Sequence, residues 1–484
     1  MKRKHAYAVF VLCAATAIAL PAQTFTTLHR FCNQGGQCAN GERPWAGLVQ
    51  ATDGNLYGTT LNGGAEACDY GCGTVFKITP SGALTTIYSF CSQGLPCADG
   101  EDPSGVLVQA SDGDFYGTTQ GGGASDACAF GCGTVFKITP GGVLTTLYTF
   151  CSLGPPCTDG EGPNAGLVQA TNGDFYGTTY GYSYCCGTVF RITPSGTLTT
   201  LHTFSGGDDG ASPWAGLVQA ANGDLYGTTA LGGDDGGTIF RITPGGTLTT
   251  LYMFDYGGQP YAALVQAANG DLYGTTLYGG AKGGGTVFKI SPSGTLTYLY
   301  SFCSRSACLD GFEPATGLVQ ATDGNLYGTT ELGGSDNSGT IFRITPGGTL
   351  TTLLSLDGRD GQTPLAPLVQ ATNGDLYGTV QYGGSYAACF YGCGTVFRLS
   401  VGLGPFVDPQ PASGKVGAVV EILGTDLTGV TSVTFNGTPA VIESSSSSAS
   451  AITTTVPAGA TSGRIQVVTS SGALSSNVPF RVLP

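Results

Sequence analysis

The chain has 484 residues, of which 81 are glycine and only 10% are charged. The glycines follow no G-X-Y period, which excludes collagen, and a hydrophobic content of 41% excludes a wholly disordered chain. The formal net charge of −14 leaves no basic surface for nucleic acid or for anionic lipid. The length allows several domains, or a repeat array with an appended module.

The N-terminus has the pattern of a targeting segment. Residues 2–4 are Lys-Arg-Lys, residues 6–20 are an apolar run, and Leu-Pro-Ala follows. This predicts a secretory signal peptide over residues 1–22, cleaved after Ala22. No later segment reaches the roughly 18 uninterrupted apolar residues of a spanning helix, so we expect no membrane insertion.

The rest of the chain is dominated by a repeat. Each copy contains Leu-Val-Gln-Ala, an Asp-Gly or Asn-Gly turn, Tyr-Gly-Thr and then Gly-Thr-Val/Ile-Phe. A turn of the type Thr-Pro-x-Gly and a further strand-like run follow in the first six copies. The seven copies of the first motif begin at Leu48, Leu107, Leu167, Leu217, Leu264, Leu318 and Leu368.

Each repeat reads as four short antiparallel strands, here called a, b, c and d. Runs rich in Val, Leu, Phe, Tyr and Thr alternate with turn residues, and four-stranded units of this length are typical of propeller blades. After the seventh c segment (394–400) no d segment follows, but residues 24–31 have the d pattern. We therefore predict an all-β fold, with a seven-bladed β-propeller over residues 23–400 that the N-terminal strand closes.

The repeat resembles the GloVer-type tandem repeats of secreted bacterial proteins. The residues that carry the resemblance are the copies of Gly-Leu-Val-Gln-Ala (47–51) and Asn-Leu-Tyr-Gly-Thr-Thr (55–60). The family implies an exported, often surface-associated repeat protein, and it supplies no catalytic residues to transfer.

Composition changes after residue 400, where Cys and Tyr disappear and Val, Ser and Thr become common. Residues 401–405 read as a linker. Residues 406–484 resemble an IPT/TIG domain through segments 417–424, 430–437, 456–457, 463–469 and 477–482. The resemblance implies an immunoglobulin-like sandwich that acts as a spacer or as a contact surface for protein or glycan.

The cysteines predict disulfide staples. Of 17 cysteines, Cys13 leaves with the signal peptide, and an even number in an exported chain favours disulfides. The simplest pairing closes each loop on itself, although sequence leaves cross-loop pairing open and a Cys-x-x-x-Cys metal site is the alternative. Adjacent Cys185 and Cys186 either form a vicinal bond or result from a shortened loop. The expected pairs are Cys32/Cys38, Cys91/Cys97, Cys151/Cys157 and Cys303/Cys308 in the d–a loops, and Cys68/Cys72, Cys128/Cys132, Cys185/Cys186 and Cys389/Cys393 in the b–c loops.

Aromatic residues before strand a are the best candidates for ligand contact. Trp45 and Trp214, the only tryptophans, and Tyr261 occupy one repeat position, which rims the channel if strand a is innermost. With Glu101 and Glu161 from the same loops, they can stack on and hydrogen-bond a sugar or anchor a peptide. The alternative is that the tryptophans only cap a blade junction.

Other chemistry is weakly indicated. His29 and His202 hold a position that is tyrosine in four other repeats, so we expect packing and not general-base catalysis. Asp-Gly pairs in the d–a loops, such as Asp99-Gly100 and Asp159-Gly160, offer oxygen ligands for calcium, but turn formation explains them as well. We expect no other cofactor.

Two functions remain open. The first is a non-enzymatic binding or cell-surface scaffold protein, monomeric and secreted, periplasmic or surface-bound, whose stapled loops meet a glycan or protein ligand. The second is a polysaccharide lyase or glycosidase, if Glu42, Glu101, Glu161 and Glu313 converge at the channel mouth. Few histidines and the repetition of the candidate glutamates favour the binding protein.

Overall fold

The structure is a computed structural model, which describes residues 23–32, 38–65, 67–68, 70–125, 127–152, 154–181, 186–384, 389, 391–445 and 449–483. The predicted signal peptide and Cys13 therefore lie outside the described residues. The described chain is almost entirely β-structure, with one 3-10 turn, η1 (Ser306–Cys308). No helix in the described part is long and apolar enough to cross a membrane.

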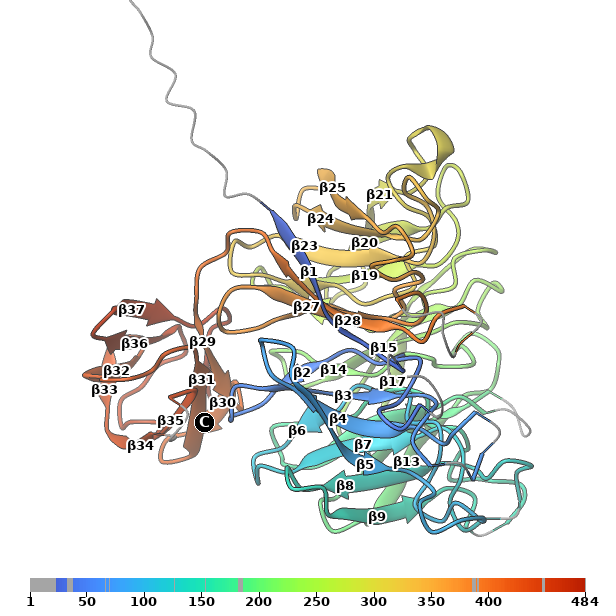
Figure 1. The fold of residues 1–484 in the computed structure, drawn as a ribbon, viewed down its shortest axis with the longest axis horizontal. Coiled ribbons are helices and arrows are strands. Elements are labelled where there is room, and N and C mark those ends of the chain that lie inside the picture. The colour runs from blue at the N-terminus through green and yellow to red at the C-terminus, as the bar shows by residue number, and fades with distance from the viewer. Residues whose placement is uncertain are drawn as a thin grey trace, which may run out of the picture.

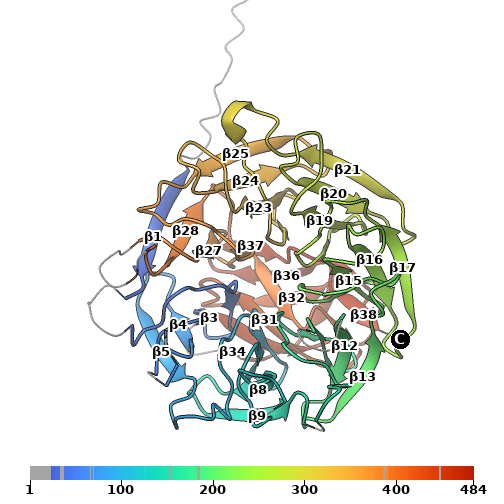
Figure 2. The same ribbon diagram turned by 90° about the vertical axis from the view of Figure 1, so that its right-hand side faces the viewer.

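Residues 24–400 form seven four-stranded antiparallel sheets within the described chain, arranged in a ring (Figures 1 and 2). We call these sheets blades 1–7, and in each of them the strands lie in the order a-b-c-d. Blades 1–3 comprise β2 (Val49–Gln50), β3 (Leu56–Thr60), β4 (Thr74–Ile78) and β5 (Leu84–Ser89); β6 (Val108–Gln109), β7 (Phe115–Thr119), β8 (Thr134–Ile138) and β9 (Leu144–Thr149); and β10 (Val168–Gln169), β11 (Phe175–Thr179), β12 (Thr188–Ile192) and β13 (Leu198–Thr203).

The remaining blades repeat this order. Blades 4–6 comprise β14 (Val218–Gln219), β15 (Leu225–Thr229), β16 (Thr238–Ile242) and β17 (Leu248–Met253); β18 (Val265–Gln266), β19 (Leu272–Thr276), β20 (Thr286–Ile290) and β21 (Leu296–Ser301); and β22 (Val319–Gln320), β23 (Leu326–Thr330), β24 (Thr340–Ile344) and β25 (Leu350–Ser355). Blade 7 comprises β26 (Val369–Gln370), β27 (Leu376–Val380), β28 (Thr395–Ser400) and, as its outer strand, β1 (Thr24–Arg30).

Strand β1 completes the ring, as the sequence predicts. It pairs antiparallel with β28 from Thr24 opposite Ser400 to Arg30 opposite Thr395. Its register shifts between Thr27 and His29, and each of the other d strands carries a shift at the corresponding place. Because β1 shares this bulge, it has the strand register of the other d strands as well as their sequence pattern.

A ring of glutamine bonds joins the blades. In each blade the Gln of strand a accepts a hydrogen bond, through Oε1, from a backbone N–H in the a–b turn of the preceding blade, at 2.7–3.1 Å. The seventh bond, from Thr372 N–H to Gln50 Oε1 at 2.8 Å, links blade 7 to blade 1. The Gln in Leu-Val-Gln-Ala therefore has a structural role at every junction.

The C-terminal residues form a β-sandwich. One sheet has the order β29-β31-β35-β34, the other β33-β32-β36-β37, and β30 pairs parallel with β38. Buried Val420, Ile422, Phe435, Ile452 and Val467 form its core. The strands are β29 (Val407–Gln410), β30 (Ser413–Lys415), β31 (Val419–Gly424), β32 (Ser432–Phe435), β33 (Thr438–Ala440), β34 (Ile442–Ser445), β35 (Ala451–Thr455), β36 (Ile465–Thr469), β37 (Gly472–Ser475) and β38 (Arg481–Leu483).

The sandwich lies over the a–b turn end of the propeller (Figure 1). Thr425 Oγ1 lies 2.9 Å from Thr372 Oγ1, and Ser450 Oγ donates to Thr52 O at 2.7 Å. Both partners on the propeller are a–b turn residues. Val401 and Leu403, in the segment expected to be a linker, pack against the apolar cluster between blades 6 and 7. The opposite, loop-bearing end of the propeller is free of these contacts among the described residues.

Candidate functional site

The d–a and b–c loops lie together at the end of the propeller away from the sandwich. Short β-bridges join them in several blades, for example Glu42 to Asn62, Glu101 to Gly121 and Gln362 to Tyr382. Seven disulfides between described cysteines close individual loops, so the local pairing expected for these cysteines is confirmed. The bonds are Cys32–Cys38, Cys68–Cys72, Cys91–Cys97, Cys128–Cys132, Cys151–Cys157, Cys303–Cys308 and Cys389–Cys393.

The eighth expected pair is only partly visible. Cys186 is disulfide-bonded, but Cys185 lies outside the described residues. The choice between a vicinal Cys185–Cys186 bond and another pairing therefore remains a prediction.

The four sulfurs at each of three junctions lie within 4.8 Å of one another, for example those of Cys68, Cys72, Cys91 and Cys97. They belong to two disulfides at each junction, and disulfide sulfur is not the thiolate that binds a metal. Each of these clusters is therefore two neighbouring disulfides, one from each of two adjacent loops.

A cavity of about 520 Å³ opens where the innermost strands begin. All seven residues at the position before strand a line it, so this repeat position does rim the channel. They are Trp45, Ser104, Asn164, Trp214, Tyr261, Ala315 and Leu365. Both tryptophans and Tyr261 are half-buried, which leaves ring surface available within the cavity.

Two of these aromatic residues, Trp214 and Tyr261, lie side by side in the central cavity, whereas Trp45 belongs to blade 1. The ring of Tyr180, in blade 3, lies 4.4 Å from that of Trp214, in blade 4, and Trp214 lies 5.8 Å from Tyr261, in blade 5. Burial raises the pKa of Tyr261, and the phenols of Tyr180 and Tyr278 add to that effect. Trp214 and Tyr261 thus form an aromatic wall of the cavity, and Tyr180 packs against it from blade 3 without lining the cavity.

An acidic pair adjoins this wall on blade 6. Glu331 lines the central cavity, and its N–H donates to the carbonyl of Glu313 at 2.8 Å. Burial raises the pKa of Glu331, and the Glu313 carboxylate raises it further. Burial also raises the pKa of Tyr278, and the charges of Glu313 and Glu331 raise it further.

The backbone of each d–a loop explains how the rim is held. The residue before the loop proline has a left-handed φ in every blade, for example 53° at Arg43, 56° at Asp102 and 57° at Glu313. Its N–H donates to the preceding blade, as Asp102 does to Cys72 O at 3.1 Å. Its carbonyl accepts from the residue after strand b, as Asp102 O does from Gln120 N–H at 3.0 Å. Such strain persists where surrounding contacts over-determine the backbone.

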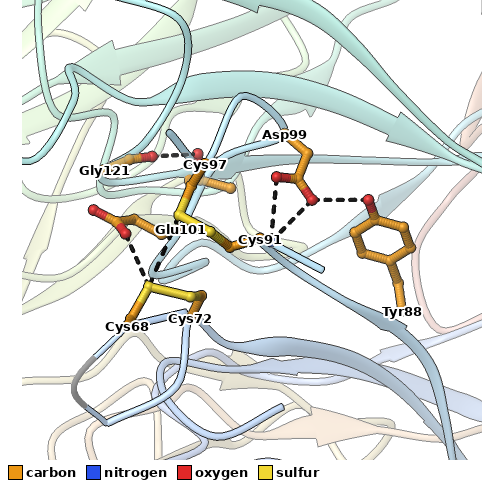
Figure 3. Close-up of a disulfide and its surroundings, with 9 residues drawn as sticks. Cys68, Cys72, Tyr88, Cys91, Cys97, Asp99, Glu101 and Gly121 are labelled. Atoms are coloured by element: carbon orange, nitrogen blue, oxygen red, sulfur yellow. Dashed lines mark hydrogen bonds between the residues drawn. A yellow bond between two sulfur atoms is a disulfide. The ribbon is translucent and has the colours of Figure 1, made fainter. Parts of the chain in front are cut away.

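Glu101 and Glu161 do not line the central cavity. They line a second cavity, of about 580 Å³, beside the stapled b–c loops of blades 1 and 2. Glu101 Oε2 lies 3.1 Å from Cys68 Sγ (Figure 3), and Glu161 Oε2 lies 3.2 Å from Cys128 Sγ. The five predicted ligand-binding residues thus divide between two cavities that share no lining residue.

The four glutamates weighed as a catalytic set do not share one position. Glu42, Glu101 and Glu161 each follow the loop glycine and face a disulfide. Glu313 lies one residue later in its repeat, at the position of Asp102. Of the residues missed by sequence reasoning, Tyr180 and Glu331 are the most important, and both directly follow strand b. That position is fixed by the preceding Gly-Thr-Thr and could have been aligned.

The histidines and loop aspartates have structural partners. His202 Nε2 lies 3.0 Å from Asp209 Oδ2, which matches the bond from Tyr88 Oη to Asp99 at 2.8 Å (Figure 3). The His202 ring packs edge-on against Phe204 at 5.0 Å. His202 therefore takes the tyrosine's packing role, and Asp99 also accepts from its own loop's Cys91 N–H.

Comparisons with known proteins agree with this architecture. The sequence profile of the Gloeobacter/Verrucomicrobia repeat matches residues 14–179, 128–321 and 305–409, and that of the IPT/TIG domain matches residues 407–482. No curated protein matches the chain.

Solved structures resemble the chain in fold. A fungal alcohol oxidase of the AA5 family, in complex with copper, has a TM-score of 0.52 and 14% identity, with 93% of this chain and 99% of that chain covered. A proposed 6-phosphogluconolactonase from Bacteroides uniformis has a TM-score of 0.45 and 18% identity, with 67% and 88% covered. At these identities the likeness to the oxidase shows a common fold alone, and the second score is too low for an argument.

Proposed function

Because the chain belongs to the Gloeobacter/Verrucomicrobia repeat family and ends in an IPT/TIG domain, we propose that it is an exported carbohydrate-binding protein whose site is the central cavity. The observation that carries the proposal is the convergence of Trp45, Trp214 and Tyr261, from three different blades, on one cavity. Its volume of about 520 Å³ lies within the range of ligand sites.

The lining has the chemistry that a sugar requires. Aromatic rings offer flat apolar surface for the C–H face of a pyranose, and Asn164 adds an amide group. The lining hydroxyls of Ser104 and Thr316 already bond Asn164 O and Thr329 Oγ1. Glu331 is the only charged side chain among the described lining residues. Its carboxylate repels an anionic ligand, so we infer a neutral sugar in preference to a polyuronate.

Export is supported by the disulfides. Seven bonds form within the described residues, and such bonds persist in oxidising compartments outside the cytoplasm. The signal pattern over residues 1–22 is consistent with this route. The sandwich lies on the end away from the cavity, so it can act as a spacer or second contact while the loop end meets its ligand.

A glycan-array screen of the oxidised protein, run beside Trp45→Ala and Trp214→Ala, tests the proposal. We expect binding to neutral glycans that both variants reduce. Tyr256→Ala is the matched control, because Tyr256 is 87% exposed and does not line the cavity. Binding that both tryptophan variants retain, or no glycan binding at all, would contradict the proposal.

A glycosidase is the second candidate, and the Glu313–Glu331 pair favours it. Glu331 is the only acid at its repeat position, and the raised pKa described above suits a general acid. Hydrolysis requires a second carboxylate, which Glu313 would supply. Release of reducing sugar from array hits, abolished by Glu331→Gln with binding retained, would establish it. Binding without turnover would exclude it for those glycans.

A further inference from the structure

The second cavity is walled by rigid, stapled loops. Tyr70 and Phe130 stand at the tips of the loops closed by Cys68–Cys72 and Cys128–Cys132. Their side chains are 71% and 82% exposed, which is unusual for large apolar groups. Both residues line the cavity together with three carboxylates, those of Glu101, Asp102 and Glu161.

The adjacent junction, between blades 7 and 1, contains the same scaffold with a cation in it. There the Arg43 guanidinium lies 5.4 Å from the ring centre of Tyr382 and 6.0 Å from that of Tyr70. Arg43 N–H donates to Cys393 O at 2.9 Å, as Asp102 N–H donates to Cys72 O at the next junction. The protein thus holds its own guanidinium against tyrosines at one copy of this position.

At the junction between blades 1 and 2, the position of Arg43 is occupied by an acidic residue, Asp102. In the repeat register, Tyr382, Arg43 and Tyr70 correspond to Asn62, Asp102 and Phe130, and all three of the latter line the second cavity. The position that supplies a cation at one junction therefore supplies a carboxylate at the next. A ligand cation would restore there the cation–aromatic contact that Arg43 makes internally.

The electrostatics of the cavity favour a cation. The described lining contains no Lys, Arg or His; Arg43 borders it and donates from Nη1 to the lining residue Asn62 at 3.4 Å. Glu101 and Glu161 contact disulfide sulfur. Burial raises the pKa of Asp102 to about 6. Burial, followed by the charge of Asp102, raises the pKa of Glu101 to about 7. A bound cation would lower the pKa of both Glu101 and Asp102, because it stabilises their charged carboxylates.

We propose that the second cavity binds the guanidinium group of an arginine side chain presented by a peptide or protein partner. A planar guanidinium stacks on an aromatic ring and donates two hydrogen bonds to one carboxylate, whereas an ammonium is a point charge. The exposed rings of Tyr70 and Phe130 would then cover the residues flanking the arginine. This site is independent of the central cavity and of its proposed carbohydrate ligand.

Calorimetric titration with a blocked Gly-Arg-Gly peptide at pH 8 tests the proposal, with citrulline and lysine peptides as probes of charge and shape. We expect one binding site, with the citrulline peptide and the Asp102→Asn variant each weakening affinity roughly tenfold or more, since a charged hydrogen bond is lost. Asparagine tolerates the left-handed φ of residue 102, so this variant keeps the loop.

Phe130→Ala provides a second variant at the surface, and Tyr391→Ala is its matched control. Tyr391 occupies the same loop-tip position in blade 7, is 57% exposed and does not line the second cavity. We expect Phe130→Ala to weaken peptide binding severalfold, and Tyr391→Ala and Trp214→Ala to leave it unchanged.

Binding should also weaken from pH 8 to pH 5. The groups facing the site are Glu101, Asp102, Glu161 and Tyr70, with Arg43 on Tyr70, and the first two carboxyls gain protons in this range. Equal binding of the citrulline peptide, equal binding of the lysine peptide, or no arginine binding would each overturn the guanidinium assignment. Stoichiometric displacement of the peptide by Ca²⁺ would reassign the cavity to a metal.

Discussion

The glycine of each Tyr-Gly-Thr copy lies under a phenylalanine ring of strand c. At Gly177, an added Cβ would come within 2.6 Å of Phe190 Cζ and 2.8 Å of Leu167 Cδ2. The tyrosine before it is buried, as Tyr57 is in blade 1, where its hydroxyl donates to Asp53 at 2.9 Å. The motif therefore packs adjacent strands and does not face the ligand end.

Replacing Gly177 with alanine should destabilise the protein by about 1–3 kcal/mol, because the ring and the leucine must move to admit a methyl group. Urea unfolding followed by circular dichroism measures the change. Gly141→Ala is the control, since its nearest neighbour would be Thr139 Oγ1 at 3.8 Å. A Gly177 variant as stable as the control would show that the packing is looser than described.

Glu101 and Asp102 give the folded state a defined pH dependence. Their pKa values of about 7 and about 6 lie above the usual values near 4 of an unfolded chain. At a pH between about 4 and about 7, these two carboxyls are therefore more often protonated in the folded protein than in the unfolded chain. Acidification from pH 8 to pH 5 therefore stabilises the folded state through these two groups.

The Glu101→Gln/Asp102→Asn double variant should lose this gain. We expect its melting temperature to rise less between pH 8 and pH 5 than that of the parent, with exposed Asp336→Asn as the control. Scanning calorimetry at both pH values measures the difference. An equal rise in the double variant and the parent would show that the two carboxyls titrate at ordinary values in the folded protein.

At the scale of the element, β1 determines whether the ring is closed. Its Phe25 stacks on Phe397 of β28 at 5.2 Å. Phe31, just after β1, is fully buried in the cluster between blades 7 and 1. Without β1, strand β28 would have an unpaired edge, which favours association with other chains.

Deleting residues 24–31 should therefore abolish cooperative unfolding and promote aggregation. Thermal melting with light scattering measures both, and a synthetic peptide of residues 23–31 added to the truncated protein should partly restore the transition. Cooperative melting at the parent's temperature would refute N-terminal closure.

At the scale of the whole molecule, the sandwich and the two cavities lie at opposite ends of the propeller. The sandwich meets the a–b turn end of the propeller through polar contacts, such as Asn477 Nδ2 to Gln320 O of strand a at 3.0 Å, while both cavities lie at the loop end. The propeller also has its own core between the blades. We therefore expect residues 23–404, which retain Val401 and Leu403, to fold alone.

This truncated protein should melt cooperatively and bind the same glycans as the full chain. Its affinity is compared with that of the full chain on the same array. Loss of glycan binding with melting intact would place part of the site on the sandwich and contradict the proposed location.

The fold could be predicted from the sequence because the motif of each strand recurs at the same place in every repeat. The missing d segment after residue 400 and its match at residues 24–31 identified closure, and the alignment of Trp45, Trp214 and Tyr261 predicted the rim. Loop residues were harder to place. Glu101 points toward a disulfide of the preceding blade, and Arg43 reaches Tyr382 across a junction, so neither follows from strand register.

Tryptophan fluorescence provides the most direct test of the central claim, since the only two tryptophans of the chain both line the central cavity. We predict that a neutral glycan bound by the protein produces a saturable change in emission, and that Trp214→Ala removes most of it and weakens binding. A glycan that binds with unchanged emission and equal affinity for both tryptophan variants would contradict the account.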